Sequence, residues 1–269
     1  MKYIVDNDLH IHSYLSVCSG ESKQTPSAIL NYAFENGLKN ICITDHCWGS
    51  TKPNKMDFYN GNYIAKQDIV RVSQVLPLPQ TEGVDFHFGC ETDIDDELNI
   101  GVTKEDYEVF EFVIIPTTHL HMFPFESVRK TAEAYIKRFE KVLDADLPFN
   151  RTGIAHLTTK LIAPGDNWKS VLNIIPDGEY YRLFKQTAKL GMGVELNAGD
   201  LAYYDDEETA VSMRVFNIAK ECGCKFYFGS DAHNPGGFSR VPTFYKLVDL
   251  LDLQEEDKFD PFMDCPERM

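Results

Sequence analysis

Short runs of β-branched and aromatic residues alternate with longer amphipathic segments along most of the chain. Seven of the short runs have the composition of β-strands. They lie at residues 3–9, 40–44, 84–90, 112–118, 152–155, 193–196 and 225–229. In the longer segments apolar residues recur every three or four positions, as on one face of an α-helix. The clearest case is 127–143, where Lys and Arg occupy the other face.

Boundary residues support the same pattern of elements. Thr25 followed by Pro26 predicts the start of a helix, and Gly37 predicts its end. Further helices are predicted near 64–76, 180–190, 211–222 and 244–253. Because most of the predicted strands are followed by a helix, we expect an α/β fold with a parallel sheet.

The chain shows no division into domains. No Pro-, Gly- or Ser-rich linker interrupts residues 1–269, so we predict a single domain with a distorted (β/α)7 TIM-like barrel. A doubly wound open sheet is the alternative, but no glycine-rich phosphate loop follows a predicted strand. The acidic residues from about 255 to 269 are expected to form a frayed tail.

Composition narrows the classes of partner. The chain has 26 Lys and Arg residues against 42 Asp and Glu residues, a formal net charge of −16 that argues against binding of long nucleic acids. No apolar run reaches the roughly 18 residues of a membrane span. Asp6 and Asp8 interrupt the first apolar run, and the seven cysteines show no CxxC spacing. We therefore expect a cytoplasmic protein with reduced thiols.

Seven of the eight histidines fall at or just after the end of a predicted strand. They are His10 and His12 after the first strand, His46 after the second, His119 and His121 after the fourth, His156 after the fifth and His233 after the seventh. Glu91 and Asp231 have equivalent places, and Glu195 lies within the sixth strand. Because the C-terminal ends of barrel strands converge on one face, these side chains are expected to meet. His87, inside the third strand, is expected to be an ordinary structural histidine.

The kinds of donor in this set indicate a catalytic metal site. Imidazoles and carboxylates without cysteine pairs suit Zn, Mn, Fe or Ni in an open site, whereas closed structural zinc sites favour cysteine pairs. In the pair His10 and His12, and in the pair Asp231 and His233, the two side chains are two residues apart and lie on one side of an extended chain. The sequence therefore predicts a centre that holds divalent ions.

Six short motifs in the chain resemble those of the PHP (polymerase and histidinol phosphatase) family. They are Asp8-Leu-His10-Ile-His12-Ser13, Ile43-Thr-Asp-His46, Gly89-Cys-Glu91, Thr118-His119, Ala155-His156 and Gly229-Ser-Asp231-Ala-His233. The motifs occur in the family's order and span residues 8–233. The resemblance implies a distorted seven-stranded barrel with two or three divalent ions (Zn, Mn or Fe), most often used to hydrolyse phosphoesters.

The resemblance also implies how the donors are divided. His10, His12, Glu91 and Asp231 would hold one ion, Glu91 would bridge to a second ion held with His119 and His156, and His46 and His233 would hold a third. Many members have a further His or Asp ligand shortly after the HxH motif, where this chain has Cys18. Cys18 could act as a thiolate ligand, or the third ion could be weakly held or absent.

The resulting hypothesis is hydrolysis of a small phosphomonoester by a metal-activated water molecule. Asp231 would accept a proton from the attacking water. Spacing leaves open which of His119 and His121 is the ligand. We favour His119, which directly ends its strand, and assign His121 to the substrate or to proton transfer. Lys160 and Arg240 are candidate phosphate-binding residues, with solvated surface charges as the alternative.

Three other functions use or could use the same donors. They are a 5′–3′ exonuclease or nucleotide phosphoesterase, an amidohydrolase-type C–N hydrolase, and a non-catalytic regulatory or metal-storage domain. Release of nucleotides from a single strand, cleavage of an amide without release of phosphate, or metal content without turnover would distinguish them. The net charge argues mildly against a polymeric substrate.

Overall fold

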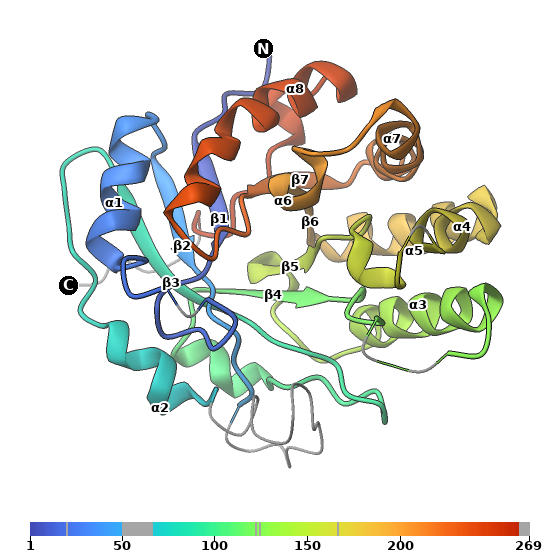
Figure 1. Ribbon diagram of the computed structural model, residues 1–269, viewed down its shortest axis with the longest axis horizontal. Coiled ribbons are helices and arrows are strands. Elements are labelled where there is room, and N and C mark those ends of the chain that lie inside the picture. The colour runs from blue at the N-terminus through green and yellow to red at the C-terminus, as the bar shows by residue number, and fades with distance from the viewer. Residues whose placement is uncertain (20, 50–66, 122, 124, 166, 264–269) are drawn as a thin grey trace.

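The computed structural model describes residues 1–19, 21–49, 67–121, 123, 125–165 and 167–263, and within them seven parallel strands lie side by side in chain order. The strands are β1 (Asn7–Ile11), β2 (Asn40–Ile43), β3 (Asp85–Glu91), β4 (Phe112–Pro116), β5 (Thr152–Ala155), β6 (Gly193–Asn197) and β7 (Lys225–Gly229). The sheet curls until its two edges meet (Figure 1). The N–H of Asp231 donates to the carbonyl of His10 at 2.8 Å, and that of His12 donates to Ala232 at 3.1 Å. The predicted distorted seven-stranded barrel is confirmed.

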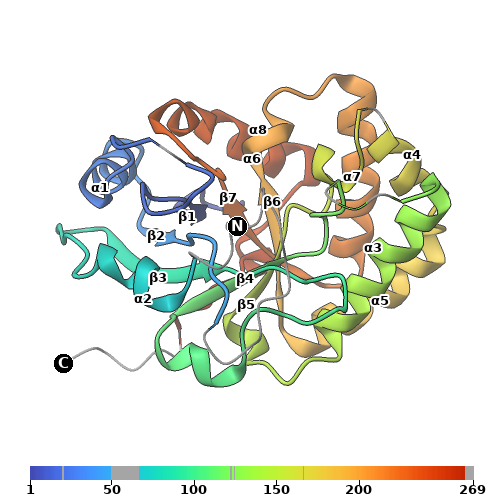
Figure 2. The ribbon, with the colours of Figure 1, turned by 60° about the horizontal axis from the view of Figure 1, so that its bottom comes forward.

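Helices cover the outside of the barrel (Figures 1 and 2). They are α1 (Pro26–Glu35), α2 (Ile69–Val72), α3 (Val128–Leu143), α4 (Asn167–Ile174), α5 (Asp177–Leu190), α6 (Ala198–Leu201), α7 (Asp206–Glu221) and α8 (Val241–Leu251). The boundary signals act as expected: the Thr25 hydroxyl accepts a hydrogen bond from the N–H of Ala28 at 3.2 Å, and Gly37 follows α1 in the left-handed conformation. Among the described residues, no helix is long and apolar enough to cross a bilayer.

Two apolar clusters hold the architecture together. The larger lies between the strands and the surrounding helices. The smaller joins residues from strands on different sides of the barrel, so it fills the interior. Its members are Leu9, Cys42, Phe112, Ile114, Ala155, Tyr227 and Phe259. Apolar side chains thus fill the interior below the C-terminal strand ends.

The C-terminal segment differs from the expected frayed tail. Glu255–Asp257 form a 3-10 turn, and Phe259 is only 6% exposed. The ring of Phe259 lies 6.0 Å from those of Phe112 and Tyr227, and it also packs over Gly193, where a Cβ atom would come within 2.5 Å of it. The side chain of Phe259 thus closes the apolar interior at the N-terminal end of the barrel. The acidic composition of the segment does not predict this role. Residues 264–269 lie outside the described residues.

Three predicted boundaries also shift. β1 begins at Asn7 rather than residue 3, because the N–H of Tyr3 bonds to the carbonyl of Leu253 instead of a neighbouring strand. β4 ends at Pro116 rather than residue 118, as the lack of an N–H on that proline predicts. The described part of the helix predicted near 64–76 is α2 followed by a 3-10 turn, and its residues before 67 lie outside the described range.

Candidate metal centre

The C-terminal strand ends bring eight predicted donors into one buried cluster. They are His10, His12, His46, Glu91, His119, His156, Asp231 and His233. The loops after β1, β2, β4, β5 and β7 supply most of them, while His10 and Glu91 come from the strands β1 and β3 themselves. Residues more than 200 positions apart in the sequence therefore contribute to one site.

The first group of donors has the spacing of a metal site. His10 Nε2 lies 3.1 Å from His12 Nε2, and both atoms lie 3.4 Å from Glu91 Oε2. Asp231 Oδ1 lies 3.2 Å from His12 Nε2 and 3.5 Å from His10 Nε2. Four donors about 2.0–2.2 Å from one ion would be spaced by roughly 3.0–3.5 Å. The donor set therefore fits one divalent ion.

Glu195 orients the first of these imidazoles. Its Oε1 atom lies 2.6 Å from His10 Nδ1, which leaves Nε2 of His10 to face the cluster. The other carboxylate oxygen accepts from the backbone N–H of His156. Gly229 makes this contact possible, because a Cβ atom there would lie 1.9 Å from Glu195 Oε1. A carboxylate behind a ligating imidazole is the usual outer-shell arrangement.

A second group lies on the other side of Glu91. Its Oε1 atom is 2.9 Å from His156 Nε2 and 3.9 Å from His119 Nε2. Because Oε2 faces the first group, the carboxylate can bridge two ions. His156 Nδ1 pairs with the Thr118 hydroxyl at 2.7 Å, and His119 Nδ1 pairs with Asp93 Oδ1 at 2.6 Å. Both rings are therefore held with Nε2 toward Glu91.

The sequence alone does not reveal the roles of two orienting carboxylates, Asp93 and Glu195. The available signal for Asp93 is its position two residues after Glu91, since alternate residues of an extended chain face one side. For Glu195 it is a carboxylate between Val194 and Leu196 in an otherwise apolar predicted strand.

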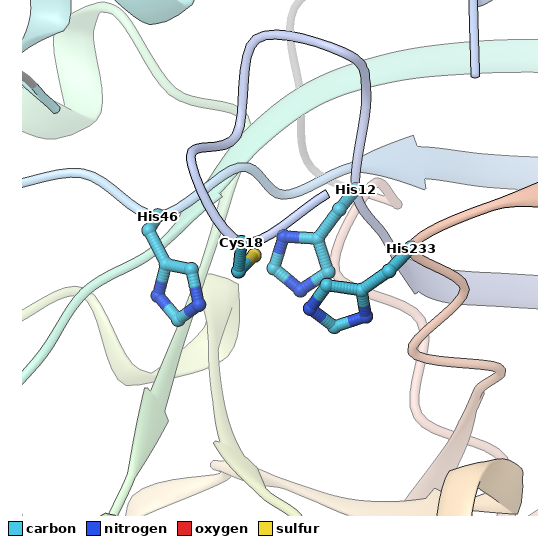
Figure 3. Close-up of side chains that lie close together, drawn as sticks. All are labelled: His12, Cys18, His46 and His233. Carbon is cyan, nitrogen blue, oxygen red and sulfur yellow. The ribbon is translucent and has the colours of Figure 1, made fainter. Parts of the chain in front are cut away.

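A third group contains Cys18 with His12, His46 and His233. Each of these residues offers a donor atom, and all four atoms lie within 4.8 Å of one another (Figure 3). Burial raises the pKa of the Cys18 thiol, but the nearby His12 and His46 outweigh burial and hold that pKa well below its ordinary value. A thiolate among imidazoles is a chemically suitable metal donor.

Electrostatics keep the buried carboxylates ionised. Burial raises the pKa of Glu91, but His46 and His10 hold it well below its usual range. For Asp231 burial acts in the same direction, and His10 is the strongest of the groups that hold its pKa far below the ordinary value. Burial lowers the pKa of His10, while Glu195 and Asp231 raise it well above the usual value. Metal ligands must bind through such ionised oxygens.

Two candidate ligands sit in strained backbone. The φ angles are +32° at His156 and +51° at Asp231, in the left-handed region that is costly for residues other than glycine. Arg240 holds the second turn, because its Nη1 atom donates to the carbonyls of Ser230 at 2.6 Å and Asp231 at 3.1 Å. The guanidinium proposed for phosphate binding thus supports the loop that carries Asp231.

Lys160 and His121 lie outside the donor cluster. Lys160 Nζ is 3.1 Å from Glu208 Oε1, so its charge is paired with a carboxylate. The ring of His121 is 6.3 Å from that of His119, and its Nδ1 atom lies 3.0 Å from the carbonyl of Leu161. His121 also lines a cavity of about 610 Å³. Between the two histidines, His119 is the one whose ring faces Glu91.

His87 lies apart from the cluster, at the opposite end of the barrel. Its Nδ1 atom is 2.9 Å from Glu111 Oε2, and its ring stacks on Phe262 with 3.4 Å between centroids. These contacts agree with an ordinary structural histidine.

Comparison with known proteins gives a consistent family. The sequence model of the PHP domain matches residues 8–199. The chain is similar to a probable phosphatase of Caldanaerobacter subterraneus subsp. tengcongensis, with 26% identity over 259 residues that cover 95% of this chain and 87% of that protein. A probable phosphatase of Thermoanaerobacter sp. strain X514 is 23% identical over 258 residues, covering 95% of this chain and 89% of the relative.

The fold is similar to that of a solved phosphatase. The histidinol phosphate phosphatase of Lactococcus lactis subsp. lactis, solved with Zn, L-histidinol and phosphate, superposes with a TM-score of 0.61 at 17% identity. The superposition covers 96% of this chain and 100% of that chain. The two proteins therefore share the barrel architecture.

Proposed function

This chain belongs to the PHP domain family, and we propose that it is a metal-dependent phosphoesterase that hydrolyses a small phosphomonoester. The observation that carries the proposal is the bridging position of Glu91, whose two oxygens face two separate groups of imidazoles. Relatives named phosphatases, and the fold shared with a phosphatase solved with zinc and phosphate, support it.

The centre would hold two or three divalent ions, which we propose to be Zn, Mn or Fe. His10, His12, Glu91 and Asp231 would hold one, and Glu91 with His119 and His156 would hold the next. Bound there, divalent ions would activate a water molecule and offset negative charge on the phosphoryl group. This also explains how a chain with a net charge of −16 can bind an anion.

Protein groups would perform the remaining tasks. Asp231, ionised and held by Arg240 through its backbone, would accept a proton from the attacking water. His121, beside the centre and on the wall of the cavity, would contact the leaving group or pass a proton to its oxygen. We propose that Lys160 and Arg240 bind the phosphate group of the substrate.

A substrate panel on protein of measured metal content tests the proposal. We expect turnover of p-nitrophenyl phosphate by the wild type, and its loss in His10→Ala and Glu91→Ala. His87→Ala, at the other end of the barrel, is the matched control and should retain turnover. Unchanged turnover in both centre variants would contradict the proposal.

The same panel separates the alternatives. Single-stranded DNA that releases nucleotides faster than a phosphomonoester releases phosphate would indicate an exonuclease. Cleavage of amides or lactams without release of phosphate would indicate C–N hydrolysis. Metal-loaded protein that is inactive on every substrate would favour a non-catalytic role.

A further inference from the structure

Cys18 is surrounded by imidazoles rather than by apolar side chains. Figure 3 shows its thiol between His46 on one side and the rings of His12 and His233 on the other. The ring centroids of His12 and His233 are 4.2 Å apart, and those of His12 and His46 are 5.0 Å apart. The sulfur is thus one of four donor atoms, the other three being imidazole nitrogens, that lie within 4.8 Å of one another.

The loop fixes Cys18 through its two sequence neighbours. The N–H of Val17 donates to Gln67 Oε1 at 2.7 Å, and Gln67 Nε2 donates to the carbonyl of His46 at 2.8 Å. On the other side, the Ser19 hydroxyl donates to the carbonyl of His233 at 2.6 Å. The backbone on both sides of the thiol is therefore tied to the segments that carry the two imidazoles.

The first and third groups are adjacent: His46 Nδ1 lies 3.3 Å from Glu91 Oε2, and His233 Nδ1 lies 3.4 Å from Asp231 Oδ1. His12 Nε2 faces His10, Glu91 and Asp231 at 3.1–3.4 Å, so that nitrogen belongs to the first group. Cys18, His46 and His233 then form a set of one sulfur and two nitrogen donors. Three protein donors with a position left open are typical of catalytic rather than structural zinc sites.

We propose that Cys18 is a thiolate ligand of a third metal position with His46 and His233, and that the sulfur makes this position selective for Zn²⁺ or Co²⁺ over Mg²⁺ or Mn²⁺. Binding would form a sulfur–metal bond and release to solvent the proton that the thiol shares with its neighbouring imidazoles. Thiolate favours softer ions, whereas carboxylate and water suit Mg²⁺ and Mn²⁺. The inference rests on the metal-binding part of the proposed function and not on the identity of the substrate.

Cobalt spectroscopy tests the ligand directly. Metal-free protein, reduced and under anaerobic conditions, is titrated with Co²⁺, and absorbance in the near-ultraviolet reports charge transfer from thiolate to cobalt. We expect the band in the wild type and its loss in Cys18→Ser and Cys18→His. Cys18→His should still bind as many ions as the wild type, because an imidazole replaces the sulfur. Cys222→Ser, which removes a half-buried thiol after α7, is the control that keeps the band.

Affinity provides the second readout. Zn²⁺ binding at the weakest-held position should fall by at least roughly 10-fold in Cys18→Ser, since even outer-shell changes cost 10- to 100-fold. Mn²⁺ binding should change much less. A fully cobalt-loaded wild type without the band, or a band that persists in Cys18→Ser, would overturn the proposal.

A measurement on the wild type alone covers the case in which the variants fail to fold. In chelated protein, iodoacetamide should alkylate Cys18, as mapped by mass spectrometry. Added Zn²⁺ should protect Cys18 from alkylation, whereas added Mg²⁺ should not. Equal modification with and without Zn²⁺ would refute ligation. If the band and the protection are found but no phosphomonoester is hydrolysed, the ligand assignment stands and the proposed function fails.

Discussion

His10 and His87 each share a short hydrogen bond with a carboxylate, at opposite ends of the same barrel. His10 Nδ1 is 2.6 Å from Glu195, and His87 Nδ1 is 2.9 Å from Glu111. The difference lies in the other ring nitrogen. In His10 it faces three further donors, whereas the ring of His87 stacks on Phe262. A histidine–carboxylate pair thus indicates a metal ligand only where the second nitrogen meets other donors.

The two ends also differ in what the interior contains. At the C-terminal end it holds charged and imidazole groups, while at the N-terminal end Phe259, Phe112 and Tyr227 pack together. We therefore expect changes at the first end to act mainly on metal binding and turnover, and changes at the second to act mainly on the free energy of unfolding.

Removal of the metal should have the largest effect on activity. Dialysis against a strong chelator is expected to abolish turnover of p-nitrophenyl phosphate, since the ions supply the activated water. Re-addition of Zn²⁺ or Mn²⁺ should restore turnover, with metal content measured alongside. Full activity in protein shown to be free of metal would contradict the assignment of a catalytic metal centre to the C-terminal end of the barrel.

Phe259→Ala should cause the largest loss of stability. The variant opens a cavity beside Phe112 and Tyr227, and truncation of a buried phenylalanine costs about 3–5 kcal/mol. Denaturant unfolding measures this loss. Metal content below the unfolding transition should match that of the wild type; depletion of metal in the folded variant would show that the two ends are coupled.

Glu195→Gln should act at the centre and have an intermediate effect. The amide keeps the shape but removes the charge that supports His10, so metal affinity should fall by about 10- to 100-fold. Competition with a chromophoric chelator measures the change. Glu111→Gln at the far end is the matched control, and an equal loss of affinity there would contradict the comparison.

His87→Ala should have the smallest effect. It removes one partly buried hydrogen bond and a ring stack, a loss of about 1 kcal/mol in the free energy of unfolding. Metal affinity and turnover should stay within about twofold of the wild type, as for changes remote from a site. A strong loss of metal would place His87 in the functional machinery.

Strand order and the positions of the main donors could be predicted from the sequence, because both depend on periodicity and strand ends. His10, His46 and His156 follow strands whose composition is clear, and parallel strands necessarily place them on one face.

Features that depend on side-chain direction could not be predicted in the same way. Asp93 and Glu195 orient imidazoles from other strands, and nothing local marks which nitrogen they contact. The role of Phe259 is equally hidden, because one aromatic residue in an acidic segment shows its value only against the barrel interior.

The seam between β1 and β7 has a consequence for biosynthesis. His10 is synthesised more than 200 residues before Asp231, which shares its donor group. A nascent chain therefore cannot present the complete first group until Asp231 has left the ribosome. An ion captured at that moment would cross-link the two ends of a loop of more than 200 residues. The conformational entropy of loop closure grows with loop length, so a cross-link across so long a loop adds the most stability.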